Sequence, residues 1–276
     1  MKTIFLFRRP LVASSLVVVT VVLGIALAGP LLAPHDPLAI NQNAVNQASS
    51  TQYLLGTDEF GRDILSRLLV GIRPTILVAV ISTIIAAIGG TACGIVGAYS
   101  RPVFAFFVMR GVDIMLSFPA ILLALLAVGF WRSGVVSLSV VIGIIFIPQF
   151  ARVAQSATLQ VIRQEFVEAE HAMGARYLRV VLRAILPNIL SPLVVQATLT
   201  IAAAILLESG LSFLGLGIVP PEPSWGQMIG TARGYLSQNP MYVVWPSVCL
   251  AVTVLAINVL GDALRDHLDP RLRENP

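Results

Sequence analysis

Residues 165–187 read EFVEAEHAMGARYLRVVLRAILP, a charged segment between two long apolar segments, 135–154 and 189–207. Each apolar segment is long enough to cross a bilayer as a helix, which takes about 20 residues. A chain embedded in lipid has little use for so long a polar insertion unless a molecule in water contacts it. The segment therefore indicates a membrane protein that a soluble partner contacts from outside the bilayer.

The composition of the whole chain is that of a membrane protein. Of the 276 residues, 57% are hydrophobic and 12% are charged, and the mean hydropathy is +0.87. This balance excludes an ordinary water-soluble domain. Because the apolar runs are continuous rather than alternating, they predict an all-α membrane protein and not a barrel.

Six transmembrane helices are expected. An alternative start for the third is Gly111, because Arg110 lies inside that apolar run. The six predicted spans are about 11–32, 74–99, 103–130, 135–154, 189–207 and 241–264.

Counting Lys and Arg predicts the orientation. If the N-terminus is cytoplasmic, 13 of the 18 basic residues lie on the cytoplasmic side and 5 on the other. Membrane proteins keep their basic residues inside, so we expect segment 1–10, loop 155–188 and tail 265–276 in the cytoplasm. The membrane domain, 11–264, then has its longest outer loop at 33–73. The net charge of +4 follows from this topology and is not a nucleic-acid footprint.

The start of the chain also has features of a cleaved secretory signal. Lys2, Arg8 and Arg9 precede an apolar run that contains Ala26-Leu27-Ala28. The run of about 22 residues exceeds a signal core of roughly 7–15 residues. Its removal would leave an odd number of spans, so we expect this segment to be the first span.

The outer loops carry two local signals. Thr57-Asp58-Glu59 resembles a helix start, and Asp63 and Arg67 are spaced to pair at i,i+4. We expect a short surface helix that leads into the second span. Its role is either structural, as a lead-in to that span, or a contact with substrate. The last outer loop, 216–240, predicts a stiff, partly interfacial turn.

Several aromatic and sulfur-containing side chains have expected places in the bilayer. Cys93 and Cys249 fall inside predicted spans and are expected to pack as small apolar groups.

His35, His171 and His267 are scattered along the sequence, so we expect no metal site. The aromatic residues expected at membrane interfaces are Trp131, Trp225, Tyr242 and Trp245.

Three ionisable residues lie in or beside the spans. Arg110 and Asp113 are three apart, which favours a local ion pair over a transport role. Glu208 lies near the outer end of the fifth span, where an ionisable group is a candidate functional residue. The alternatives for Glu208 are a carboxylate that reaches the interface or one that caps the following Ser-Gly turn.

The charged segment itself predicts two short helices. The first, 163–172, lacks Gly and Pro, and Gly174 is suited to the left-handed turn that follows. The second covers about 177–186, and Pro187 is expected to stop it and open the next span. Two angled helices across the inner membrane surface would let a partner move the fourth and fifth spans together.

Glu168-Ala169, Gly174 and Leu186-Pro187 resemble the EAA motif of permease subunits of ATP-binding-cassette importers. The chain departs from the motif at Glu170, where Ala is usual, and at Ala184, where Ile is frequent. Other segments resemble the peptide-importer branch, the second permease of dipeptide, oligopeptide and nickel systems. These segments are 55–63, 110–113 with Phe118-Pro119, 211–217 and 261–270.

The resemblance implies a type I importer permease fold in the bacterial cytoplasmic (inner) membrane. Glu168, Ala169 and Gly174 would lie on a coupling helix that docks on an ATPase, with Leu186 and Pro187 completing the motif. The implied partners are a second permease, two cytoplasmic ATP-binding subunits, an extracytoplasmic binding protein and membrane lipid. ATP and magnesium would be bound by those ATPases, and this chain would hold no cofactor and catalyse no reaction.

Other functions make different demands on the sequence. An ion-driven secondary transporter usually has acidic or broken-helix sites near mid-membrane, and a channel needs a ring or filter. A membrane enzyme needs a polar constellation inside the spans. The chain also lacks the phosphate loop GxxxxGK(S/T) of an ATPase. The resemblance favours short peptides as substrate, with nickel or a metal chelate as the alternative.

Overall fold

The computed structural model describes residues 10–130 and 134–268. The predictions for residues 1–9, for Trp131 and for the tail from residue 269 onward lie outside the described residues. Within the described ranges the regular structure is helical, apart from one isolated bridge between Thr57 and Asp63. The all-α prediction is therefore confirmed.

Five helices in the described ranges are long and apolar enough to cross a membrane. They match the predicted first, second, fourth, fifth and sixth spans. They are α2 (Pro10–Leu32), α3 (Ile64–Tyr99), α6 (Val135–Val161), the helix that includes α9 (Leu186–Phe213), and α11 (Met241–Leu268).

The third predicted span is not one straight helix. It consists of α4 (Pro102–Leu116) and α5 (Ala120–Phe130), which are bent by 93° at the break between them. Pro119 lies in the break, and a proline disfavours the helical conformation of the residue before it, here Phe118. The chain has six candidate spans only if this bent pair counts as one.

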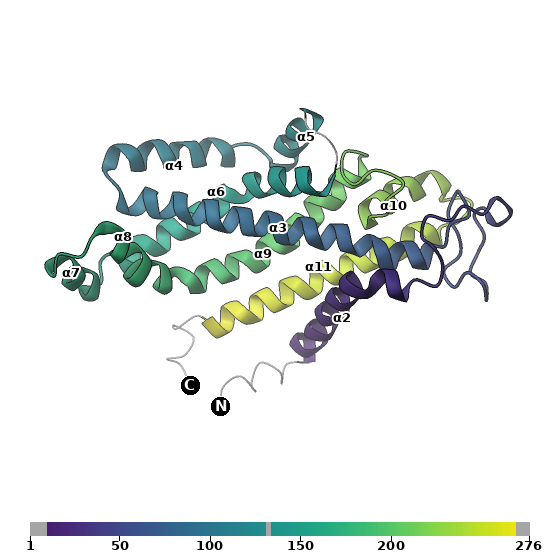
Figure 1. Ribbon diagram of the computed structural model, residues 1–276, viewed down its shortest axis with the longest axis horizontal. Coiled ribbons are helices and arrows are strands. Elements are labelled where there is room, and N and C mark those ends of the chain that lie inside the picture. The colour runs from purple at the N-terminus through teal and green to yellow at the C-terminus, as the bar shows by residue number, and fades with distance from the viewer. Residues whose placement is uncertain (1–9, 131–133, 269–276) are drawn as a thin grey trace.

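Figure 1 shows the helices side by side along the long axis of the molecule. At one end, the α10 end, lie α10 (Trp225–Ala232) and the loop between α2 and α3. At the other, the α7 end, lie α7 (Glu165–Ala172) and the turn between α3 and α4. The loop at the α10 end contains only the short 3-10 helix η1 (Gln42–Ala44).

At the α10 end, the structure contradicts three predictions: the helix start at Thr57 and the interfacial positions of Trp225 and Tyr242. Helix α3 begins at Ile64 with Asp63 as its N-cap, whose carboxylate accepts from the Ser66 amide at 3.0 Å, so no helix starts at Thr57. Trp225 is buried, and its indole N–H donates to the Leu68 carbonyl at 3.1 Å. Tyr242 is also buried. Neither aromatic residue marks a membrane interface, because both pack inside the protein.

Among the described helices, α3 and α6 share the most extensive contact and run side by side (Figure 1). Gly90 and Gly94 face α6 so closely that a Cβ on Gly94 would lie 2.5 Å from the Ala151 carbonyl oxygen. Small residues spaced four apart let helix backbones approach in lipid, where no hydrophobic effect drives association. Cys93 packs beside this contact and Cys249 packs against the main core, as expected.

We predict that Gly94→Ala destabilises the protein by about 1–3 kcal/mol, because the added methyl group overpacks a backbone contact. The thermal unfolding midpoint of the purified protein measures the effect. Gly111→Ala is the matched control, since a Cβ at Gly111 of α4 would meet no atom within 4 Å. Equal midpoints for the two variants would contradict the close α3–α6 contact.

Candidate functional site

Helix α7 forms the first part of the charged segment. Glu165 and Glu168 lie in its first turn, where negative charge is favoured by the helix dipole. Gly174 follows the helix with φ of 76°, and its amide donates to the His171 carbonyl at 2.9 Å. The Ala175 amide donates to the Glu170 carbonyl at 3.0 Å. These two bonds form a Schellman motif, so Gly174 makes the left-handed turn that the sequence predicts.

The second part of the segment is continuous with the fifth span. Helix α8 (Tyr177–Val180) passes through a π-helical turn, η2 (Val181–Ile185), directly into α9. The prediction that Pro187 stops the short helix is therefore wrong, whereas its predicted place in the first turn of the next span, α9, is confirmed. In the wide turn the Leu186 amide donates to the Val181 carbonyl, five residues earlier. A wider turn tolerates a proline, which has no N–H and crowds the preceding turn of an ordinary helix.

Three contacts attach α7 and α8 to the rest of the protein. Val167 is buried, and the Tyr99 hydroxyl lies 2.7 Å from Nε2 of His171. The Tyr99 ring also stacks on Tyr177, with centroids 4.5 Å apart. Tyr99 is the last residue of α3. Helix α7 is thus held to the second span, a contact that sequence reasoning missed because it joins distant segments.

Most of the surface of α7 and α8 is open. Glu168 and Ala169 are exposed, and so are the large apolar side chains Phe166, Met173 and Leu178, the last two by 76% and 64%. Exposed apolar groups along one short segment indicate an interaction surface. Of the predicted motif residues, Glu168, Ala169 and Gly174 lie together here, whereas Leu186 and Pro187 lie at the start of α9.

The ionisable residues in the spans have other partners than predicted. Asp113 pairs with Arg152 of α6, so the predicted ion pair with Arg110 is wrong, and Arg110 is exposed. Glu208 is fully buried inside α9 and accepts hydrogen bonds from Ser212 at 2.7 Å and Ser209 at 3.3 Å. It neither reaches an interface nor caps a turn, because α9 continues to Phe213.

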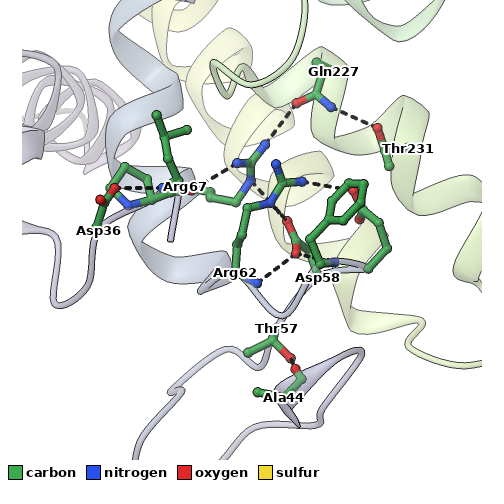
Figure 2. Close-up of polar contacts among 12 residues, drawn as sticks. Asp36, Ala44, Thr57, Asp58, Arg62, Arg67, Gln227 and Thr231 are labelled. Atoms are coloured by element: carbon green, nitrogen blue, oxygen red, sulfur yellow. Dashed lines mark hydrogen bonds and ion pairs between the residues drawn. The ribbon is translucent and has the colours of Figure 1, made fainter. Parts of the chain in front are cut away.

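Sequence reasoning also missed a buried ionic cluster at the α10 end, drawn in Figure 2. Asp58 is fully buried and accepts from the Arg62 side chain at 2.6 Å and from the Arg62 amide at 2.9 Å. The second cation, Arg67, is also fully buried and lies 3.4 Å from Asp58. The predicted Asp63–Arg67 pair is therefore wrong. The ionic cluster is defined by Asp58, Arg62, Arg67 and Glu59, which pairs with Arg62 at 3.0 Å.

The ionic cluster joins three segments that are distant in the chain. Arg67 of α3 donates to the Pro37 carbonyl at 3.1 Å and to Gln227 of α10 at 3.4 Å (Figure 2). Nearby, Asn239 donates to the Thr57 carbonyl at 3.3 Å. The run of charged residues in 58–67 was the sequence signal for this cluster. Its spacing favoured a pair along one helix, however, and did not indicate the distant partners of Arg67.

Comparison with known proteins gives consistent matches. The family model of the binding-protein-dependent transport system inner membrane component matches residues 90–274. The chain is 38% identical to the di/tripeptide transport system permease protein DppC of Pseudomonas aeruginosa, over 90% of this chain and 84% of that protein. It is 36% identical to the glutathione transport system permease protein GsiD of Pectobacterium atrosepticum, over 98% of this chain and 89% of that protein.

A solved structure has the same fold. The inward-facing MetNI methionine ABC transporter matches with a TM-score of 0.60 and 25% identity. The match covers 72% of this chain and 94% of that chain. The fold of the described helices is therefore that of a type I importer permease.

We predict that Asp58→Ala lowers the free energy of unfolding by about 3–5 kcal/mol, because it leaves the buried guanidinium of Arg67 without a carboxylate and that of Arg62 with Glu59 alone. Thermal unfolding of the purified protein measures this loss. Glu222→Ala, which removes an exposed carboxylate at the same end, is the control and should change stability by about 0.5 kcal/mol or less. An unchanged midpoint for Asp58→Ala would refute the ionic cluster's role.

We also predict that Tyr99→Phe increases amide hydrogen exchange in α7. The variant removes one hydrogen bond, worth about 1 kcal/mol, and keeps the ring stack, so exchange should rise roughly fivefold. Peptides that cover Glu165–Ala172 report the change by mass spectrometry. Peptides that cover α10 serve as the internal control, and exchange that rises equally at both ends would contradict a local effect.

Proposed function

Because the chain belongs to the family of binding-protein-dependent transport system inner membrane components, we propose that it is the second permease of an importer of dipeptides or short oligopeptides. The chain is a multi-pass membrane protein and a permease subunit of an ATP-binding-cassette importer. The peptide substrate is supported by the names of its relatives, among them the dipeptide permease of Haemophilus influenzae at 35% identity. Glutathione is the second candidate, on the likeness to glutathione permeases.

The proposed assembly has a second permease, two cytoplasmic ATPases that bind ATP and magnesium, and an extracytoplasmic binding protein. We assign the α7 end to the cytoplasm of a bacterium, because 13 of the 18 basic residues then lie inside. Both termini fall on the same side in this orientation. Helix α2 ends and α11 begins at the α10 end, which supports that arrangement (Figure 1).

The exposed surface of α7 carries the proposal that this chain couples to an ATPase. A cytoplasmic helix and turn that leave Phe166, Met173 and the carboxylate of Glu168 in water have the mixed character of a docking element. Glu168 is the residue that would meet a basic side chain of the ATPase, and Gly174 holds the turn behind it. Movement of a docked α7 would pull on α6, which precedes it, and on α9, which continues from α8 without a break.

The first test is to purify the tagged chain in mild detergent and identify what accompanies it. Recovery of a second permease and ATPase subunits, with ATP hydrolysis, is the expected result. The complex, reconstituted with its binding protein, should then take up a labelled dipeptide when ATP is present. Competition by unlabelled glutathione distinguishes the second candidate. A chain that purifies alone, without ATPase activity, would contradict the importer assembly.

We predict that Glu168→Ala weakens docking roughly 10- to 100-fold, the loss expected for one hydrogen bond to a charged group. ATP-driven uptake by reconstituted complexes measures the effect, together with the amount of ATPase that co-purifies. Glu165→Ala is the matched control, because Glu165 is also exposed and lies in the same first turn of α7. Normal uptake by the complex with Glu168→Ala would contradict a role of Glu168 in docking.

A further inference from the structure

One charged pair joins α4 and α6, which both belong to candidate spans. Asp113 of α4 pairs with Arg152 of α6, and the two side chains are 34% and 49% exposed. Arg152 lies nine residues before Val161, the last residue of α6, or about 14 Å along the helix axis. A charged pair in this part of a spanning helix avoids lipid tails and faces water, the headgroups or the interior of an assembly.

Neighbouring residues make the exposed face of α6 polar over two turns. Gln149 and Ser156 are exposed on the same side as Arg152, at spacings of three and four residues. Arg152 also donates to Gln155 at 3.5 Å, and Gln155 donates to the Gly97 carbonyl of α3 at 3.3 Å. The pair is therefore held in place from α3 while its outer side stays open.

The exposed face of α3 has the opposite character. Its exposed side chains at helical spacing are Leu77, Val80, Ile84 and Ile88, the last two by 52% and 69%. An apolar stripe of this kind suits lipid tails, whereas an exposed Gln-Arg-Ser stripe does not. The two exposed faces therefore suit different surroundings, lipid for α3 and water for α6.

We propose that the polar face of α6 at Gln149, Arg152 and Ser156, with Asp113 of α4, lines the cytoplasmic half of the translocation pathway and binds the charged termini of a passing peptide. Arg152 takes the terminal carboxylate, for which a guanidinium offers two parallel N–H donors. Asp113 takes the terminal ammonium group. The inference rests on the proposed function, because it assumes that peptides pass through this assembly.

The first experiment measures access of water to the two faces. Single cysteines replace Gln149 and Ser156 on α6, or Ile84 and Ile88 on α3, in the full complex in nanodiscs, which expose both membrane sides. A charged methanethiosulfonate reagent should label Q149C and S156C on the order of tenfold faster than I84C and I88C, because only a hydrated thiol ionises to the reactive thiolate. The parent chain, which carries Cys93 and Cys249, supplies the background.

Equal, slow labelling at all four positions would overturn the proposal, because it would mean that lipid or the second permease covers the polar face of α6. Uptake by the wild-type complex is measured in parallel. Absence of peptide uptake would refute the proposed function itself. Peptide uptake without preferential labelling would refute only the pathway assignment.

The second experiment measures which peptide groups are recognised. Dialanine should slow labelling of S156C, and its C-terminal amide and its N-acetyl form should each protect less. In the Arg152→Gln variant, dialanine and its amide should protect S156C equally. In the Asp113→Asn variant, dialanine and its N-acetyl form should protect S156C equally. Arg152→Lys keeps the positive charge, so dialanine should again protect more strongly than its amide.

A merely structural ion pair would change assembly without changing these preferences, so selectivity separates the two roles. Protection that is equal for dialanine and both blocked forms in the wild type would overturn the recognition of termini. Protection is measured on the complex of permeases and ATPases with the binding protein left out, so selection by the binding protein does not affect the result.

Discussion

The backbone contact between α3 and α6 is the constraint on which the rest of the structure depends. In lipid, helices gain nothing from burying apolar surface against each other, so association requires close packing. Gly90 and Gly94 provide it by placing α3 directly on Phe150, Ala151 and Ala154. Any larger residue at these glycines would separate the two helices and every element attached to their ends.

Helix α3 connects the two ends of the molecule. Its first turns carry Arg67, which reaches Asp58, the Pro37 carbonyl and Gln227. Its last residue, Tyr99, contacts His171 of α7 and Tyr177 of α8. Since α6 packs along α3 and runs on toward α7, a displacement of α7 acts on a pair of helices that move together. The fifth span receives the same displacement directly, through the continuous helix from Tyr177 to Phe213.

Apolar length alone predicts much of this fold. Five spans and the turn at Gly174 follow from local rules, because span length and a left-handed glycine need no distant partner. Hydropathy misses the bend between α4 and α5, since the run is continuous through Phe118 and only the geometry of Pro119 divides it. Ionic partners fail for a different reason. Spacing predicts pairs along one helix, whereas Arg67 of α3 pairs with Asp58 of the preceding loop and Asp113 of α4 pairs with Arg152 of α6 through packing between elements.

The two ends of α3 are attached by interactions of different strength. At the α10 end the charges are buried, and removing one partner of such a pair costs about 3–5 kcal/mol. At the α7 end the Tyr99–His171 contact is exposed, and a hydrogen bond of that kind contributes about 1 kcal/mol. This difference suits the proposed coupling to a cytoplasmic ATPase. The weakly held end can shift when a partner binds, while the ionic cluster keeps the other end of the same helix in place.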